Sequence, residues 1–232
     1  MIRIRPAAER GSTNLDWLES YHSFSFGDFY DPAAMSFRSL RVINDDRIGP
    51  GGGFGMHGHR DMEIVTYMLS GSLAHQDSLG SGESLRPGDV QAMTAGRGIR
   101  HSEFNASPSE PAHLLQVWLL PARPGLEPSY SQRHFDVAEK QGRWRVVASA
   151  DGRDGSLLVH QDVQLLAALL APGETVDYAL ATDRHAWLQV ARGTVELNGQ
   201  QFAAGDGAAI SDETQLRLTG IESADVLLFD LA

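Results

Sequence analysis

The strongest constraint on the fold is a pattern of strand and turn signals that occurs twice along the chain. In each half an apolar run ends at a glycine, a hairpin signal follows, and a Gly-Asp turn opens the next run. These features are residues 65–71 with Gly88-Asp89 in the first half, and residues 187–193 with Gly205-Asp206 in the second. Short β-rich runs between regular turn signals are typical of β-sandwiches and β-barrels. The repeat therefore predicts two similar all-β domains in one chain.

The boundary between the two domains is predicted from a Pro-rich segment, residues 121–128, which is the natural connector. We expect an N-terminal barrel over residues 1–130 and a C-terminal barrel over residues 131–232. Helices should be few and short. Residues 14–20 and 135–141 are the two candidates.

Composition excludes several kinds of site and partner. The chain has no cysteine, so a metal must be held by His, Asp or Glu, and thiol chemistry is excluded. The formal net charge of −11 argues against direct binding to nucleic acid. No apolar run reaches the length of about 18 residues that suggests a membrane span. Residues 1–11 lack the apolar segment of a secretory signal, so we expect a cytoplasmic protein.

Two pairs of side chains point to metal chemistry. His57 and His59 are two residues apart, as are His101 and Glu103, and residues at this spacing point to one side of a strand. If both segments lie in one barrel, three imidazoles and one carboxylate converge inside it, a set that suits divalent transition metals. This set alone is compatible with an oxygenase, an isomerase or a hydrolase. The other histidines occur singly, which is typical of structural residues: His22, His75, His113, His134, His160 and His185.

The glycines around these pairs resemble the two cupin motifs. Residues 51–71 resemble the first motif, with one extra residue before its last glycine, and residues 98–105 resemble the end of the second. Gly96 stands where the generic second motif has proline. More closely, most of residues 20–130 resembles the pirin family, of the bacterial quercetinase-like type. The matching stretches begin His22-Ser-Phe-Ser-Phe-Gly-Asp, His57-Gly-His-Arg-Asp-Met-Glu, His75-Gln-Asp-Ser-Leu-Gly, Arg86-Pro-Gly-Asp-Val, Met93-Thr-Ala-Gly-Arg-Gly, His101-Ser-Glu and Leu115-Gln-Val-Trp-Leu.

The resemblance implies two cupin-type jelly-roll barrels and a metal held by His57, His59, His101 and Glu103. Glu63, the carboxylate of the first cupin motif, is then assigned to the surroundings of the metal or to the fold. Iron(II) is the expected metal, and nickel, cobalt, copper, manganese and zinc are the alternatives.

The activity implied by the resemblance is that of a quercetin 2,3-dioxygenase, which cleaves a flavonol-like polyphenol with dioxygen. Glu103 would act as the catalytic base, and an apolar wall would surround the planar substrate. We name Phe54, Met56, Met93 and Trp118 as candidates for that wall. The alternative is a metal-dependent redox or ligand sensor of pirin type that acts through protein partners without turnover. A sugar-binding or small-acid-binding module is a third option, and we expect a monomer.

The second half offers no matching ligand set. Aligning Gly193 with Gly71 places Ala179 and Ala181 where His57 and His59 stand. Counting on from Gly205-Asp206 as from Gly88-Asp89 places Leu218 opposite His101. We therefore expect a C-terminal barrel without a metal site.

Overall fold

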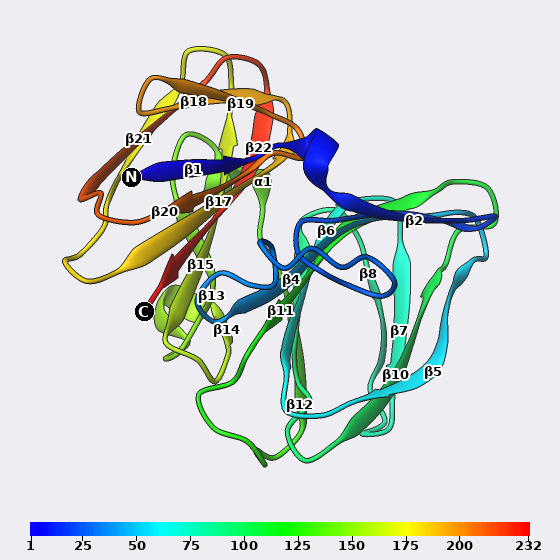
Figure 1. Ribbon diagram of the computed structural model, residues 1–232. Helices are drawn as coiled ribbons and strands as arrows, with labels where there is room; N and C mark the ends of the chain where they lie inside the picture. Colours follow the sequence, from blue (N-terminus) through cyan, green and yellow to red (C-terminus); the bar gives the residue numbers. More distant parts are fainter. The chain divides into compact units, whose positions relative to one another are not determined.

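β-Strands make up most of the chain in the computed structural model, which describes residues 1–232 (Figure 1). The helical segments are α1 (Val137–Lys140) and two 3-10 turns, Ala7–Glu9 and Arg153–Gly155. This confirms the all-β prediction with few short helices. The chain divides into two units, which are described separately below.

The N-terminal unit comprises Gly11–His134 and Leu157–Gln161. It contains two antiparallel sheets, with strand orders β12-β9-β6-β11-β4-β3-β2 and β5-β10-β7-β8. Its strands are β2 (Gly11–Leu15), β3 (Leu18–His22), β4 (Leu40–Ile48), β5 (Gly53–His59), β6 (Glu63–Ser70), β7 (Leu73–Asp77), β8 (Gly82–Leu85), β9 (Asp89–Thr94), β10 (Ile99–Asn105), β11 (Ala112–Leu119), β12 (Ser129–His134) and β14 (Leu157–Leu158).

The C-terminal unit comprises Met1–Arg10, Phe135–Ser156 and Asp162–Ala232. Its strands follow the orders β1-β20-β17-β22-β15-β13 and β16-β21-β18-β19. They are β1 (Ile2–Arg5), β13 (Arg145–Ser149), β15 (Val163–Leu170), β16 (Thr175–Ala179), β17 (His185–Arg192), β18 (Thr194–Leu197), β19 (Gln200–Ala203), β20 (Gly207–Ile210), β21 (Gln215–Gly220) and β22 (Ala224–Leu231). No helix of the chain has the length and apolar character needed to span a membrane.

The helix expected at residues 14–20 is wrong, because these residues form the hairpin of β2 and β3. Leu15 and Leu18 have the spacing of a helical face, but Leu18, Ser20 and His22 alternate along β3 and are buried. β3 adds to the sheet by pairing with β4, so hydrogen bonds to a distant segment determine the local structure. The second expected helix is present as α1, where Glu139 accepts the backbone N–H of Asp136 at 3.0 Å.

The structure shows how two segments, β12 and β1, are paired within their respective units. The Pro-rich segment, residues 121–128, leads into β12, which pairs with β9 of the N-terminal unit. The chain passes to the C-terminal unit after His134. At the other end of the sequence, β1 pairs with β20, with Ile2 opposite Ile210.

Candidate metal centre

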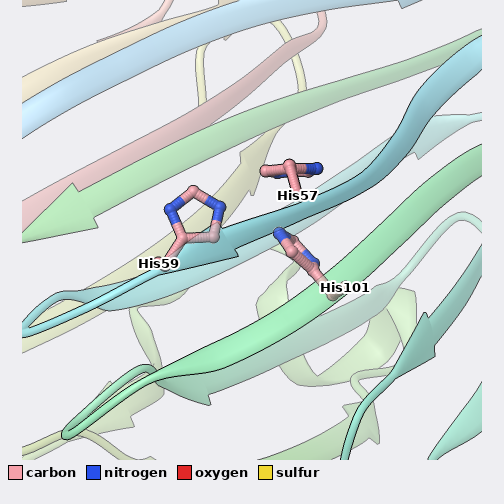
Figure 2. Close-up of side chains that lie close together, drawn as sticks. All are labelled: His57, His59 and His101. Carbon is pink, nitrogen blue, oxygen red and sulfur yellow. The ribbon is translucent and has the colours of Figure 1, made fainter.

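Three imidazoles from two neighbouring strands point toward one another in the N-terminal unit (Figure 2). His57 and His59 lie on β5, and His101 lies on β10 directly opposite His57. The ring centroids are 4.4 Å apart for His57 and His101, 4.8 Å for His57 and His59, and 4.9 Å for His59 and His101. One nitrogen of each ring lies within 4.8 Å of the other two, so the three can reach one ion.

The nitrogens of these rings suit a metal because they are available as lone-pair donors. The Nδ1 of His57 bonds to the backbone oxygen of Gly55 at 2.8 Å. A carbonyl oxygen only accepts, so Nδ1 carries the proton and Nε2 keeps its lone pair. The Nε2 of His59 and both ring nitrogens of His101 are buried without a hydrogen-bond partner. A bound cation would satisfy the Nε2 of His59 and one nitrogen of His101, whose burial without a partner otherwise costs stability.

Burial also keeps two of the rings uncharged. It lowers the pKa of His59 to about 4, and the charge of His57 contributes to this shift. Burial lowers the pKa of His101 to about 3, with further contributions from His57, His59 and His75. At neutral pH both rings are in the unprotonated form that binds a metal.

Glu103 lies beside this cluster but has different nearest neighbours. Its carboxylate groups with His101 and His75, rather than with His57 and His59. The Nε2 of Gln116 donates to one Glu103 oxygen at 2.9 Å, and the other oxygen has no partner. Burial raises the pKa of Glu103 to about 7. The charge of Asp46 also raises this pKa, whereas the hydrogen bond from Gln116 lowers it. A carboxyl group with such a pKa can exchange a proton near neutral pH.

A cavity of about 430 Å³ opens onto His57, His59 and Glu103. Its apolar wall includes the rings of Trp17, Phe26, Phe54 and Trp118. Two of the four side chains expected to line it, Phe54 and Trp118, therefore do so. The other two expectations are wrong: Met56 is 47% exposed, and Met93 is buried in a cluster with Ile64, Ala95 and Ile99.

A polar wall of the same cavity comes from β2, β3 and β4, and sequence reasoning missed it. His22 bonds to Thr13 at 2.9 Å and to Asn44 at 2.8 Å, and Ser20 donates to Asp46. Burial raises the pKa of Asp46 to about 7, although the Ser20 hydrogen bond opposes the shift. The one sequence signal was the stretch that begins at His22, whose polar residues had no assigned role.

Glu63 does not line the cavity and bonds to the fold instead. One of its oxygens accepts the Thr94 hydroxyl at 2.9 Å and the backbone N–H of His160 at 3.0 Å. These bonds link β6, β9 and the segment Leu157–Gln161 within the N-terminal unit.

Comparisons with known proteins cover both halves of the chain. The Pirin family model matches residues 3–119, and the model of the quercetinase C-terminal cupin domain matches residues 146–231. The chain is 48% identical over 231 residues to a quercetin 2,3-dioxygenase of Escherichia coli, across 100% of this chain and 99% of the relative. It is 42% identical over 233 residues to a pirin-like protein of Caulobacter vibrioides, with 100% of each chain covered.

Solved structures agree with these sequence matches. The crystal structure of YhhW from Escherichia coli has a TM-score of 0.96 and 47% identity, and the match covers 100% of this chain and 98% of that one. A structure of bacterial pirin YhhW in complex with nickel(II) has a TM-score of 0.94 and 48% identity, with 100% and 99% covered.

Proposed function

This chain belongs to the pirin family, and we propose that it is a metal-dependent dioxygenase that cleaves flavonol-like polyphenols. The observation that supports this most directly is the opening of the aromatic-lined cavity onto the imidazole cluster. A pocket of this volume, apolar with a few convergent polar groups, is typical of small-molecule sites.

The metal in this proposal is a divalent transition ion held by His57, His59, His101 and Glu103. The donor atoms are the Nε2 of His57, the buried Nε2 of His59, one buried nitrogen of His101 and one oxygen of Glu103. Imidazole with one carboxylate suits iron(II), which we take as the resident ion. Nickel, cobalt, copper, manganese and zinc are the alternatives, and a related pirin has been crystallised with nickel(II).

The substrate in this proposal is a planar aromatic molecule with several hydroxyl groups, and dioxygen is the second substrate. The rings of Trp17, Phe54 and Trp118 offer flat apolar surfaces for such a molecule. The polar wall, formed by Thr13, Ser20, His22, Asn44 and Asp46, offers hydrogen-bonding groups to its hydroxyls.

Proton transfer in the reaction is assigned to Glu103. When bound, the metal would lower the pKa of a coordinated substrate hydroxyl and so favour its ionised form. Glu103 accepts that proton, either directly or after its bond to the metal loosens. Its side chain lines the cavity, and burial raises its pKa to about 7. The apolar rings exclude water from the ionised substrate. One flavonol and one dioxygen then give one ring-opened ester and one carbon monoxide, with the flavonol oxidised, dioxygen reduced and no other reductant required.

The test is oxygen consumption and carbon monoxide release with quercetin. Metal-free protein would be loaded separately with each of the six ions, and both gases would be measured on the same samples. With at least one of the metals, we expect the protein to consume oxygen and release carbon monoxide in equal amounts. Metal-free protein should do neither. Flavonol binding with no turnover for any metal would overturn the proposal and favour the sensor alternative.

A further inference from the structure

The stretch His75-Gln-Asp-Ser-Leu-Gly has no role in the proposed function, although it lies against the candidate metal ligands. β7 pairs with β10 so that Asp77 stands opposite His101 and His75 stands opposite Glu103. The side chains of His75 and Asp77 are both fully buried. A buried ionisable pair beside a metal site needs a physical explanation.

Asp77 fixes the orientation of the His75 ring. The Nε2 of His75 lies 3.1 Å from one Asp77 oxygen. The other Asp77 oxygen accepts the backbone N–H groups of Leu79 at 2.8 Å and Ser81 at 3.1 Å, which holds the carboxylate in the turn after β7. A carboxylate accepts hydrogen bonds, so the proton of the neutral His75 ring is on Nε2 and its Nδ1 keeps a lone pair.

The unpartnered nitrogen of His75 belongs to a ring that lies beside His101, which needs an acceptor. The Nδ1 of His75 is buried without a partner, as are both nitrogens of His101. The two ring centroids are 5.3 Å apart, and the Tyr130 ring stacks on His75 at 4.5 Å. When one nitrogen of His101 binds a metal, its other nitrogen carries a proton, and metal-bound histidines almost always donate this proton to a neighbour.

We propose that Asp77 and His75 are positioning residues for the metal, in which Asp77 sets the tautomer of His75 and the Nδ1 of His75 accepts the second N–H of His101. The interaction fixes the orientation of the His101 ring and raises its basicity as a ligand. The inference depends on the proposed metal site but not on dioxygenase activity. It also gives His75 and Asp77 of that stretch a function.

The experiment compares metal affinity in two variants and a matched control. His75→Phe keeps an aromatic ring beside Tyr130 but removes the acceptor. Asp77→Asn keeps an oxygen for the turn but no longer fixes the tautomer of His75. Asp89→Asn is the control, because Asp89 also pairs with a histidine, His134, at 2.6 Å and accepts a turn N–H, that of Arg86, at 2.8 Å.

The readouts are the dissociation constant for cobalt(II) by chelator competition, the visible spectrum of the cobalt(II) protein, and thermal unfolding of the metal-free protein. We expect the dissociation constant to rise about 10-fold to 100-fold in His75→Phe and Asp77→Asn, with a changed spectrum. The control should keep both wild-type values. No substrate is present, so these results are independent of whether the protein turns over a flavonol.

Three outcomes would overturn the inference. An unchanged dissociation constant in either variant would show that His101 needs no acceptor from this pair. An equal loss in the Asp89→Asn control would assign the effect to general loosening of the barrel. Loss of a nitrogen from the cobalt coordination shell in His75→Phe, measured by X-ray absorption, would make His75 a direct ligand. If His75→Phe does not fold, Asp77→Asn still decides the question.

Discussion

The two barrels present different interiors at equivalent strands. In the sheet orders β5-β10-β7-β8 and β16-β21-β18-β19, the pair β5/β10 corresponds to β16/β21. His57 stands opposite His101 in the first pair, and Val176 stands opposite Leu218 in the second. Leu218 also pairs with Leu197, which lies four residues after Gly193 as His75 lies four residues after Gly71. Because His75 pairs with Glu103, the register places Leu218 at the position of Glu103 rather than of His101.

The C-terminal barrel has an apolar interior, whereas the N-terminal barrel contains a cavity with polar walls. Val176 and Leu218 belong to one large cluster of buried side chains that also includes Leu188, Phe202 and Leu228. The N-terminal barrel instead has a row of buried polar side chains on successive strands: His22, Asn44, Gln116, Thr66 and Gln91. In this row the Thr66 hydroxyl and both amide atoms of Gln91 have no hydrogen-bond partner. Buried polar atoms without partners destabilise a fold, so this interior is better explained by a ligand than by stability.

Of the substitutions that compare the two barrels, we expect His101→Ala to have the largest effect, which is on metal affinity. We expect this variant to lose metal affinity by more than about 100-fold, because loss of a ligand should exceed the 10-fold to 100-fold cost of losing a second-sphere partner. It should still fold, since the apolar side chains around the site remain. Metal content by elemental analysis and circular dichroism would be measured on the same sample. An unfolded variant would make the metal a structural requirement and contradict the comparison.

A change in the corresponding strand of the other barrel, Leu218→Ala, should have the opposite profile. Removing this buried leucine should lower the free energy of unfolding by about 2–5 kcal/mol. Metal content should stay at one ion per chain, because Leu218 belongs to the apolar cluster of the C-terminal unit. Denaturant unfolding and elemental analysis measure the two effects. A metal content near two in the parent protein would show that the C-terminal barrel also binds a metal.

Glu103→Gln tests whether the Glu103 carboxylate accepts a proton from the substrate in addition to binding the metal. The variant keeps an oxygen donor but cannot accept a proton, so metal content should fall only partly. Oxygen consumption with quercetin should fall about 100-fold or more. Glu63→Gln is the control, since Glu63 is equally buried but bonds only to the fold. Full activity in Glu103→Gln would leave Glu103 at most a ligand.

Local sequence signals predicted the all-β fold and the two pairs of candidate ligands. Alternation along a strand placed His57 with His59 and His101 with Glu103, and the repeated turns predicted two barrels. The same local reasoning failed at residues 14–20, because the pairing of β3 with β4 depends on residues far away in the sequence. The pairing of β1 with β20 spans almost the whole chain, and no local signal encodes it.

The parts of the site that were missed depend on neighbouring strands coming together. His75 was taken as one of the scattered histidines, since only the register of β7 against β10 brings it to His101. Asp46 was overlooked because its burial depends on β3 and β11, which flank β4. A spacing of two residues between His75 and Asp77 was the available signal, and it matched the spacing that identified the ligands.

Asp46→Asn measures how much the buried polar wall lowers the free energy of unfolding. We expect this substitution to have the smallest effect of the four. Burial raises the pKa of Asp46 from 3.8 to about 7, so the folded protein holds this proton more tightly than the unfolded chain does. Below pH 3.8 both states are protonated and the shift has no effect on stability. As the pH rises the unfolded state ionises first, so the wild type loses stability until about pH 7, where the loss is complete.

The variant lacks this titration, and its amide oxygen can still accept the Ser20 hydroxyl. The metal-free variant should therefore gain stability relative to wild type between pH 4 and about pH 7, with a constant difference above that. One pKa unit corresponds to about 1.4 kcal/mol, so the upper limit is about 4 kcal/mol, and relaxation of the site should reduce it to about 1–2 kcal/mol. Urea unfolding at several pH values measures the difference, with Asp28→Asn, exposed at the same cavity, as the control. A difference that does not change with pH would mean that Asp46 has the same pKa in the folded and unfolded states. The polar wall would then cost the barrel less stability than its burial indicates.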